Sequence, residues 1–254
     1  MSFLDLRSTN LTDSGIALLC KGLVSCKTLM NLNVSKNDIT STGIEKFAPI
    51  LYMTSITELD LSLNPLGNNG VKFLAEHLFE RIEDGRSLSR RGKKCNLVRL
   101  NLIETKFQEN GVYHLCKQLV DYHSLQYLFL DYNQFETKNM TCFVSLMKST
   151  RLHTLSLNYC KLGDEGGVHL GEAVMFSNSI RDLSARHCEF GDTSAKSFAH
   201  ALEANSNVER LDLSNNLIND AGGELIGLSI ASNRNLKYLN LRRNNMRATS
   251  GAMF

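Results

Sequence analysis

The residues best suited to contact another molecule are aromatic side chains that gather in the middle of the chain. Tyr127, Phe129, Tyr132 and Tyr159 stand within two adjacent segments of similar pattern, whereas the other segments have few aromatics. Exposed aromatic residues on a rigid surface are typical anchors for protein partners. Tyr and Phe also favour strands and pack on one another across a sheet, so a purely structural role stays open.

Five further residues complete this predicted partner-binding surface. Two of them are aliphatic and extend its apolar area, and three are charged or polar and could orient a partner. The whole predicted surface comprises Leu63, Ile103, Tyr127, Phe129, Asp131, Tyr132, Tyr159, Arg186 and His187.

The sequence lacks the residue patterns of catalytic and metal sites. Its histidines are scattered without metal-ligand spacing, and it contains no His-Glu-x-x-His motif, no Gly-x-Ser-x-Gly motif and no phosphate-cradling glycine loop. Asp60, Asp131 and Asp212 belong to separate segments, too far apart for paired acid–base catalysis. We therefore predict that the protein is not an enzyme and has no catalytic residues, metal or cofactor.

Composition narrows the classes of partner. The formal net charge of the 254 residues is +2, which favours neither nucleic acid nor anionic membrane. No apolar run is long enough to span a bilayer, and we recognise no secretory signal at the N-terminus. The seven cysteines are odd in number and lack C-x-x-C spacing, which indicates a reducing, cytoplasmic compartment. We expect protein partners, and no nucleic acid, membrane or small-molecule substrate.

A repeated pattern must position these residues. Segments of the form L-x-x-L-x-L recur from one end of the chain to the other, at intervals of 27 or 28 residues with a single interval of 41. Alternate leucines predict a short strand with one buried face. A helical pattern of apolar residues follows each strand, introduced by residue types that cap helix N-termini. The segments begin at Met1, Leu29, Ile56, Leu97, Leu125, Leu152, Ile180, Val208 and Leu236.

This pattern resembles the leucine-rich repeats of the ribonuclease-inhibitor-like class over essentially the whole chain. The resemblance implies an α/β solenoid, or horseshoe, of about nine repeats with parallel strands on the concave face and helices on the convex face. It also implies a residue after each strand that caps backbone groups where the chain turns. In this sequence that ladder position holds Thr9, Asn37, Asn64, Thr105, Asn133, Cys160, Cys188, Asn216 and Asn244.

Residues 1–254 form a single repeat domain in this reading, with a basic insertion loop at residues 80–96. The insertion accounts for the interval of 41 residues, and it projects from one rim as a solvated loop, a partner-docking segment or a nuclear-targeting segment. Its basic residues are Arg86, Arg90, Arg91, Lys93 and Lys94. No polar capping repeat is recognisable at either end, so we expect a longer polypeptide or neighbouring subunits to cover the ends.

Two functions remain under consideration. We favour a non-catalytic scaffold for protein–protein interaction, a structural or adaptor subunit of a larger intracellular complex; a cytoskeletal or ciliary axonemal complex is the preferred setting. The alternative is a GTPase-activating protein of the kind that acts on the small GTPase Ran, which resembles this chain in fold. Those activators supply an arginine from an early strand-to-helix loop to stabilise transition-state charge. The corresponding loops here, SKNDITST and SLNPLGNN, contain no arginine.

The repeat register predicts that Leu211 is a core residue. We expect Leu211→Ala to lower the free energy of unfolding by about 2–5 kcal/mol, through lost burial and the cavity that remains. Denaturant titration measures the change. A negligible loss would show that the register is wrong.

Overall fold

Nine short parallel strands form one continuous sheet in the computed structural model, which describes residues 1–78, 82–83, 88–89, 95–120, 122–135 and 140–247. Each strand pairs with the next repeat's strand in register, so that Leu100 lies opposite Leu128. In spatial order the strands are β1 (Phe3–Asp5), β2 (Asn31–Asn33), β3 (Glu58–Asp60), β6 (Arg99–Asn101), β7 (Tyr127–Phe129), β8 (Thr154–Ser156), β9 (Asp182–Ser184), β10 (Arg210–Asp212) and β11 (Tyr238–Asn240).

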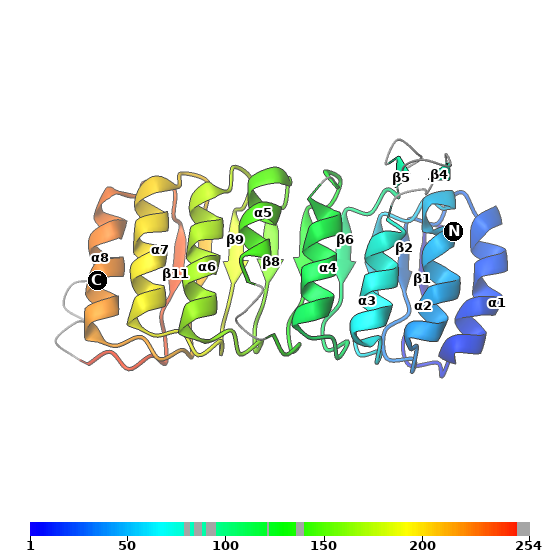
Figure 1. Cartoon of the computed structure of the whole chain (residues 1–254), viewed down its shortest axis with the longest axis horizontal. Helices are drawn as coiled ribbons and strands as arrows, with labels where there is room; N and C mark the ends of the chain where they lie inside the picture. Colours follow the sequence, from blue (N-terminus) through cyan, green and yellow to red (C-terminus); the bar gives the residue numbers. More distant parts are fainter. Residues whose placement is uncertain (79–81, 84–87, 90–94, 121, 136–139, 248–254) are drawn as a thin grey trace.

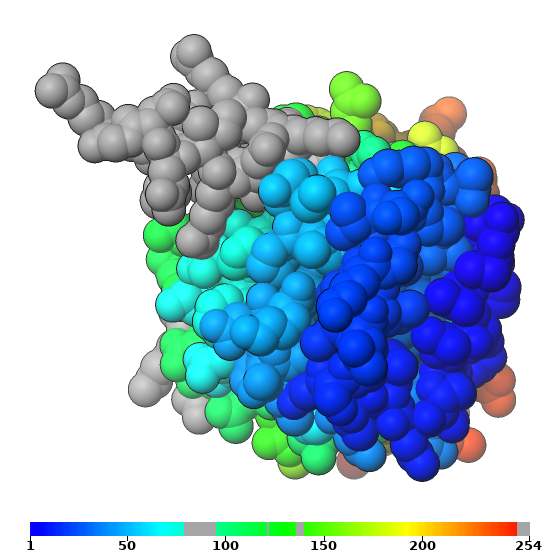
Figure 2. Space-filling model, turned by 90° about the vertical axis from the view of Figure 1, so that its right-hand side faces the viewer, coloured from blue at the N-terminus to red at the C-terminus, as the bar shows by residue number. Residues whose placement is uncertain are grey.

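The α-helices of the described chain form a second layer over one face of this sheet (Figure 1). The arrangement confirms the predicted leucine-rich-repeat solenoid. Figure 2 looks onto its N-terminal end, which the residues of the first repeats form. The helices are α1 (Thr12–Ser25), α2 (Ser41–Phe47), α3 (Gly67–Glu76), α4 (Glu109–Leu119), α5 (Cys142–Ser149), α6 (Gly163–Phe176), α7 (Asp192–Ala204) and α8 (Asp220–Ser232).

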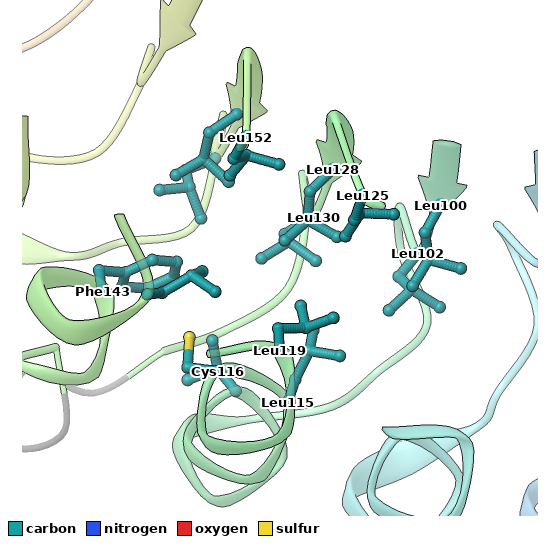
Figure 3. Packing of buried hydrophobic residues seen from close by; sticks show 14 of the residues in the cluster. Leu100, Leu102, Leu115, Cys116, Leu119, Leu125, Leu128, Leu130, Phe143 and Leu152 are labelled. Carbon is teal, nitrogen blue, oxygen red and sulfur yellow. The ribbon is translucent and has the colours of Figure 1, made fainter. Parts of the chain in front are cut away.

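The hydrophobic core lies between the two layers. Leucines at alternate positions, such as Leu128 in β7 and Leu130 just after it, point toward Leu115 and Leu119 of α4 (Figure 3). Leu211, at the centre of β10, is only 1% exposed, as the register predicts. Because the repeats contribute apolar residues, mostly leucines, at the same positions, one continuous core runs the length of the solenoid.

Two segments depart from the regular repeat. Helix α2 ends at Phe47 and continues as a 3₁₀-helix, η1 (Ala48–Met53), because Pro49 cannot donate the backbone hydrogen bond that an α-helix requires. Within the insertion at residues 80–96, β4 (Ile82–Glu83) and β5 (Leu88–Ser89) pair antiparallel, where we expected only a loop. The basic residues of this insertion, Arg86, Arg90, Arg91, Lys93 and Lys94, lie outside the described residues.

The ladder residues join each repeat to the one before it. The Asn64 side chain is fully buried, and its Oδ1 accepts the backbone N–H groups of Asn37 and Ile39, at 2.9 and 3.0 Å. Its Nδ2 donates to three backbone carbonyls, one in the preceding repeat and two in its own. Asn37, Asn133, Asn216 and Asn244 act in the same way. The capping role predicted for this position is therefore confirmed, and it operates between repeats.

Acidic residues near the helix starts form a second link between repeats. We expected them to cap their own helices, but they reach to the following helix instead. Asp13, in α1, accepts the backbone N–H groups of Thr40 and Gly43 at the start of α2. Asp164 and Asp192 serve α7 and α8 in the same way. The start of each of these helices is therefore satisfied only when the preceding repeat is in place.

The hydrogen bonds of the ladder position predict that removing one buried asparagine lowers the free energy of unfolding substantially. Asn64→Ala removes the acceptor of two buried backbone N–H groups and the donor to the Leu61 carbonyl, so we expect a loss of about 3 kcal/mol or more in the free energy of unfolding. Asn69→Ala, at an exposed position in α3, is the matched control and should change stability by less than about 0.5 kcal/mol. Equal losses in denaturant titrations of the two variants would contradict the role of the ladder.

Candidate partner-binding site

A column of outward-pointing residues follows the strands along one rim of the sheet. In each repeat, one residue between the strand and the ladder position adopts a left-handed backbone with φ between +52° and +60°. From Ser8 to Asn215, the N–H of this residue donates to a backbone carbonyl of the next repeat, as Tyr132 does to Asn158 at 2.8 Å. We name this set the rim column, and it consists of Ser8, Lys36, Leu63, Glu104, Tyr132, Tyr159, His187, Asn215 and Arg243.

Three consecutive members of the rim column form a stack of parallel rings. The ring centroids of Tyr132 and Tyr159 lie 4.3 Å apart at an interplanar angle of 9°, and those of Tyr159 and His187 lie 4.3 Å apart at 15°. Neighbouring strands are about 4.8 Å apart, so the sheet itself sets a spacing at which flat side chains in one column meet face to face. We call these three residues the ring stack. All three side chains are exposed.

A second group lies on the sheet face, the side of the sheet that points away from the helices. The guanidinium carbon of Arg99 lies 4.2 Å from the ring centroid of Tyr127 and 5.5 Å from that of Phe129. Arg99 Nε also lies 3.6 Å from Glu58 Oε2. Such cation–π contacts hold an arginine flat across aromatic rings. We call Arg99, Tyr127 and Phe129 the sheet-face cluster.

The sheet-face cluster borders a shallow hollow. The hollow encloses about 330 Å³ and spans β1 to β7. Phe129 and Ile103 contribute its apolar lining, while Glu58, Asp60 and Arg99 contribute charge. An apolar base with a few charged groups is the composition expected where a partner side chain inserts.

The predicted surface is thus two groups rather than one. Tyr127 and Phe129 belong to the sheet-face cluster, and Ile103 lines the hollow beside them. Tyr132, Tyr159 and His187 form the ring stack, with Arg186 exposed next to it in sequence. Leu63 is exposed in the rim column, but Glu104 occupies the position between it and the stack.

Asp131 corrects the prediction, because its side chain is only 6% exposed. Its Oδ1 accepts hydrogen bonds from the Ser156 hydroxyl and the Asn158 backbone N–H, both at 2.6 Å. In the outer repeats an Asp or Asn at the last position of the strand accepts the backbone N–H of the residue two positions later. Asp60 accepts the N–H of Ser62 in this way. In β8 the last position of the strand holds Ser156, so the Asn158 N–H is accepted by Asp131 of the preceding repeat instead. Asp131 therefore supports the turn and is not available to a partner.

Arg99 was missed by the sequence prediction. It stands at the first position of its strand, the same column as Tyr127, and Tyr127 was the only residue of that column included in the predicted surface. The in-register pairing of β6 with β7 places Arg99 opposite Tyr127. Residues on either side of the buried strand leucine point to the same outer face of the sheet. Applying this alternation to the residue before Leu100, as well as to the residue after it, would have placed Arg99 on the surface.

Cys160 and Cys188 are buried free thiols at the ladder position. Burial raises the pKa of the Cys188 thiol to about 12, and burial also raises the pKa of Cys160. Both therefore stay protonated at neutral pH and donate to backbone carbonyls, Cys188 to Leu157 at 3.0 Å and Cys160 to Leu130 at 3.3 Å. The structural role predicted for these cysteines is confirmed.

The described residues contain neither a metal-binding cluster nor a membrane-spanning helix. Among them, no three His, Cys, Asp or Glu side chains are grouped so as to hold a metal ion. No helix in the same residues has the length and apolar character needed to cross a bilayer.

The environment of Asp131 predicts opposite effects for two substitutions. Burial raises its pKa, and the hydrogen bonds from Ser156 and Asn158 only partly offset this effect. The native state therefore holds the proton more tightly than the unfolded chain, so stability falls as the pH rises through the folded pKa. Asp131→Asn keeps an acceptor and removes the buried charge, and should be at least as stable as the wild type at pH 7.

Asp131→Ala removes the acceptor as well and should lower the free energy of unfolding by about 1–3 kcal/mol. Denaturant titrations between pH 4 and pH 7 measure both effects. Any advantage of the asparagine variant should shrink toward the ordinary carboxyl pKa of about 4. An asparagine variant as unstable as the alanine variant at pH 7 would show that the turn requires the charge itself.

Comparison with known proteins agrees with this architecture. The model of the family described as "Leucine Rich repeat" matches residues 1–20, 25–48, 52–75, 148–171, 204–227 and 232–254. Ribonuclease inhibitor from Sus scrofa is 31% identical over 187 residues, which cover 66% of this chain and 41% of the inhibitor. NACHT, LRR and PYD domains-containing protein 13 from Homo sapiens is 31% identical over 172 residues, 66% of this chain and 15% of that protein.

This chain therefore spans less than half the length of either relative. The solved structure of TLR13 in complex with ssRNA13 matches 94% of this chain and 29% of its own, with a TM-score of 0.51 at 17% identity, and supports the fold alone. Repeats, fold and relatives agree: the chain belongs to the leucine-rich repeat family, in its ribonuclease-inhibitor-like class.

Proposed function

We propose that this protein is a non-catalytic scaffold that binds a partner protein on its sheet face, centred on Phe129. The observation that carries the proposal is the sheet-face cluster, in which Arg99 lies against both Tyr127 and Phe129 beside a hollow. Aromatic and arginine side chains dominate binding energy at protein interfaces because they bury much area at little cost in flexibility. A pre-packed cluster loses less side-chain freedom on binding than mobile side chains would.

The electrostatics of the hollow are suited to a mixed polar and apolar contact. Glu58 accepts a hydrogen bond from Asn31 at 3.1 Å and lies near Arg99, so its charge is partly compensated. Asp60 turns one oxygen to the Ser62 N–H at 2.9 Å, which holds the carboxylate at the edge of the hollow. These fixed groups favour specificity and orientation, while Phe129 and Ile103 supply the apolar contact.

The setting of this scaffold belongs to the same proposal. We propose a structural or adaptor role in a larger intracellular assembly, with a cytoskeletal or ciliary complex as the setting to test first. The family supports a role in protein binding, and the ribonuclease inhibitor relative is named for an inhibitory activity on another protein. The early strand-to-helix loops without arginine favour the scaffold over a GTPase activator.

The test is a native affinity purification of the tagged protein from cells that express it. Three forms are compared: the wild type, a double variant Tyr127→Ala with Phe129→Ala, and Tyr113→Ala. Tyr113 is an exposed aromatic on α4, in the helix layer, and serves as the matched control. We expect a near-stoichiometric partner with the wild type and the control, and affinity for that partner reduced by about 2 kcal/mol or more in the double variant.

Three outcomes would count against the proposal. Equal affinity for all three forms would place the partner away from the sheet face. The absence of any stoichiometric protein would contradict the scaffold function. Retention of a small GTPase that depends on nucleotide and on a transition-state mimic would favour the activator function instead. Circular dichroism of each variant controls for folding.

A further inference from the structure

A second hollow lies beside the ring stack, on the rim rather than on the sheet face. It encloses about 450 Å³ and runs across four consecutive repeats, from Tyr132 to Asn215. One side is lined by the rim column, and the other by the residues two positions later in the chain. We call it the rim groove. It is lined by Tyr132, Tyr159, Lys161, His187, Glu189 and Leu217, together with Asn215.

The first side of the rim groove is aromatic and rigid. The rings of the stack lie face to face along the solenoid, so each ring is supported by its neighbour. Desolvation and the neighbouring Tyr159 hydroxyl both raise the pKa of Tyr132, which therefore remains a neutral hydroxyl at physiological pH. A stack of supported rings with polar edges can contact an apolar group and hydrogen-bond a backbone in the same place.

The second side carries a fixed order of charge. Lys161, Glu189 and Leu217 follow Tyr159, His187 and Asn215 by two residues each, so they stand in consecutive repeats. Lys161 and Glu189 are exposed and share a left-handed backbone, with φ of +48° and +65°. Among the described residues, neither side chain forms an ion pair. The groove thus presents a cation, then an anion, then an exposed leucine in sequence.

This order discriminates between possible occupants. A single-stranded nucleic acid needs a groove of consistent positive charge for its phosphates, and Glu189 would repel them. An extended polypeptide can carry opposite charges and an apolar side chain in sequence, and its backbone can meet the tyrosine hydroxyls. Charge complementarity therefore favours a peptide.

We propose that the rim groove binds an extended segment of a partner protein. The segment places an acidic side chain at Lys161, a basic side chain at Glu189 and an apolar side chain between Leu217 and the ring stack. This inference rests on the proposed scaffold function, because it assigns a second contact on the same solenoid. The sheet-face cluster then holds one part of the partner, and the rim groove selects a sequence in another.

The test is selection of random linear peptides displayed on phage against the purified full chain. Selection is repeated on Tyr159→Ala, which interrupts the stack, and on a charge-exchanged variant, Lys161→Glu with Glu189→Lys. Both charged residues are exposed, so the exchange should not disturb folding. Thermal unfolding of each variant verifies this, and Tyr113→Ala again serves as the aromatic control.

We expect the wild type to enrich peptides that combine an acidic, a basic and an apolar residue in a constant order. The charge-exchanged variant should enrich peptides with the two charges reversed. A synthetic peptide of the wild-type consensus should bind Tyr159→Ala about tenfold more weakly, equivalent to about 1.4 kcal/mol, and bind Tyr113→Ala normally.

Failure to enrich a consensus, or a consensus that the charge exchange leaves unchanged, would overturn the peptide groove. Binding of single-stranded homopolymer RNA that is lost in Tyr159→Ala would overturn it in favour of nucleic acid. Either failure leaves the scaffold function intact if the Tyr127 and Phe129 variant still loses its partner. Loss of the consensus together with an unaffected partner in that variant would contradict both.

Discussion

The fold depends on backbone groups that only a neighbouring repeat can satisfy. Asn64 accepts two N–H groups of the preceding repeat, and Asp13 accepts two at the start of the following helix. A buried backbone group without a partner costs about 1–3 kcal/mol, so an isolated repeat would bear several such costs while also exposing its leucines. Stability therefore arises between repeats. The in-register sheet is the geometric consequence, because these bonds form only when equivalent residues are aligned.

That register also decides which surface residues can act together. Equivalent positions in consecutive repeats lie one strand spacing apart, whereas different positions in one repeat point to different parts of the surface. Tyr132 and Tyr159 are 27 residues apart in the chain, yet their rings stack. Phe129 and Tyr132 are close in sequence but line separate hollows. A binding surface on this fold is therefore composed by column, and a cluster of aromatics in the sequence is not by itself a cluster in space.

The same distinction explains how far the sequence could predict the structure. The period of the leucines predicts the sheet, the helices and the core, because burial of alternate residues leaves little freedom. It does not predict Asp131, which has the residue type of an exposed site yet is buried by the need of its neighbour for a hydrogen-bond acceptor. It does not predict that Asp164 serves the next helix, since a residue near a helix start is compatible with either target. Arg99 was within reach, because the register that aligns Leu100 with Leu128 also aligns Arg99 with Tyr127.

Phe129 and the ring stack lie in three consecutive repeats that depart from the consensus. Phe129 occupies a position that holds Asp or Asn in several other repeats. In the following repeat this position holds Ser156, and Asp131 accepts the backbone N–H of Asn158. Cys160 and Cys188 replace the ladder asparagine in the two repeats that contribute Tyr159 and His187 to the ring stack, and their thiols donate to backbone carbonyls. The buried core stays continuous through these repeats, with Ala185 at a place that holds a leucine in the repeats on either side. A fold that needed only stability would have no reason to place these changes in adjacent repeats beneath exposed aromatics. Their coincidence with Phe129 and the ring stack is what favours a recognition surface in this part of the solenoid.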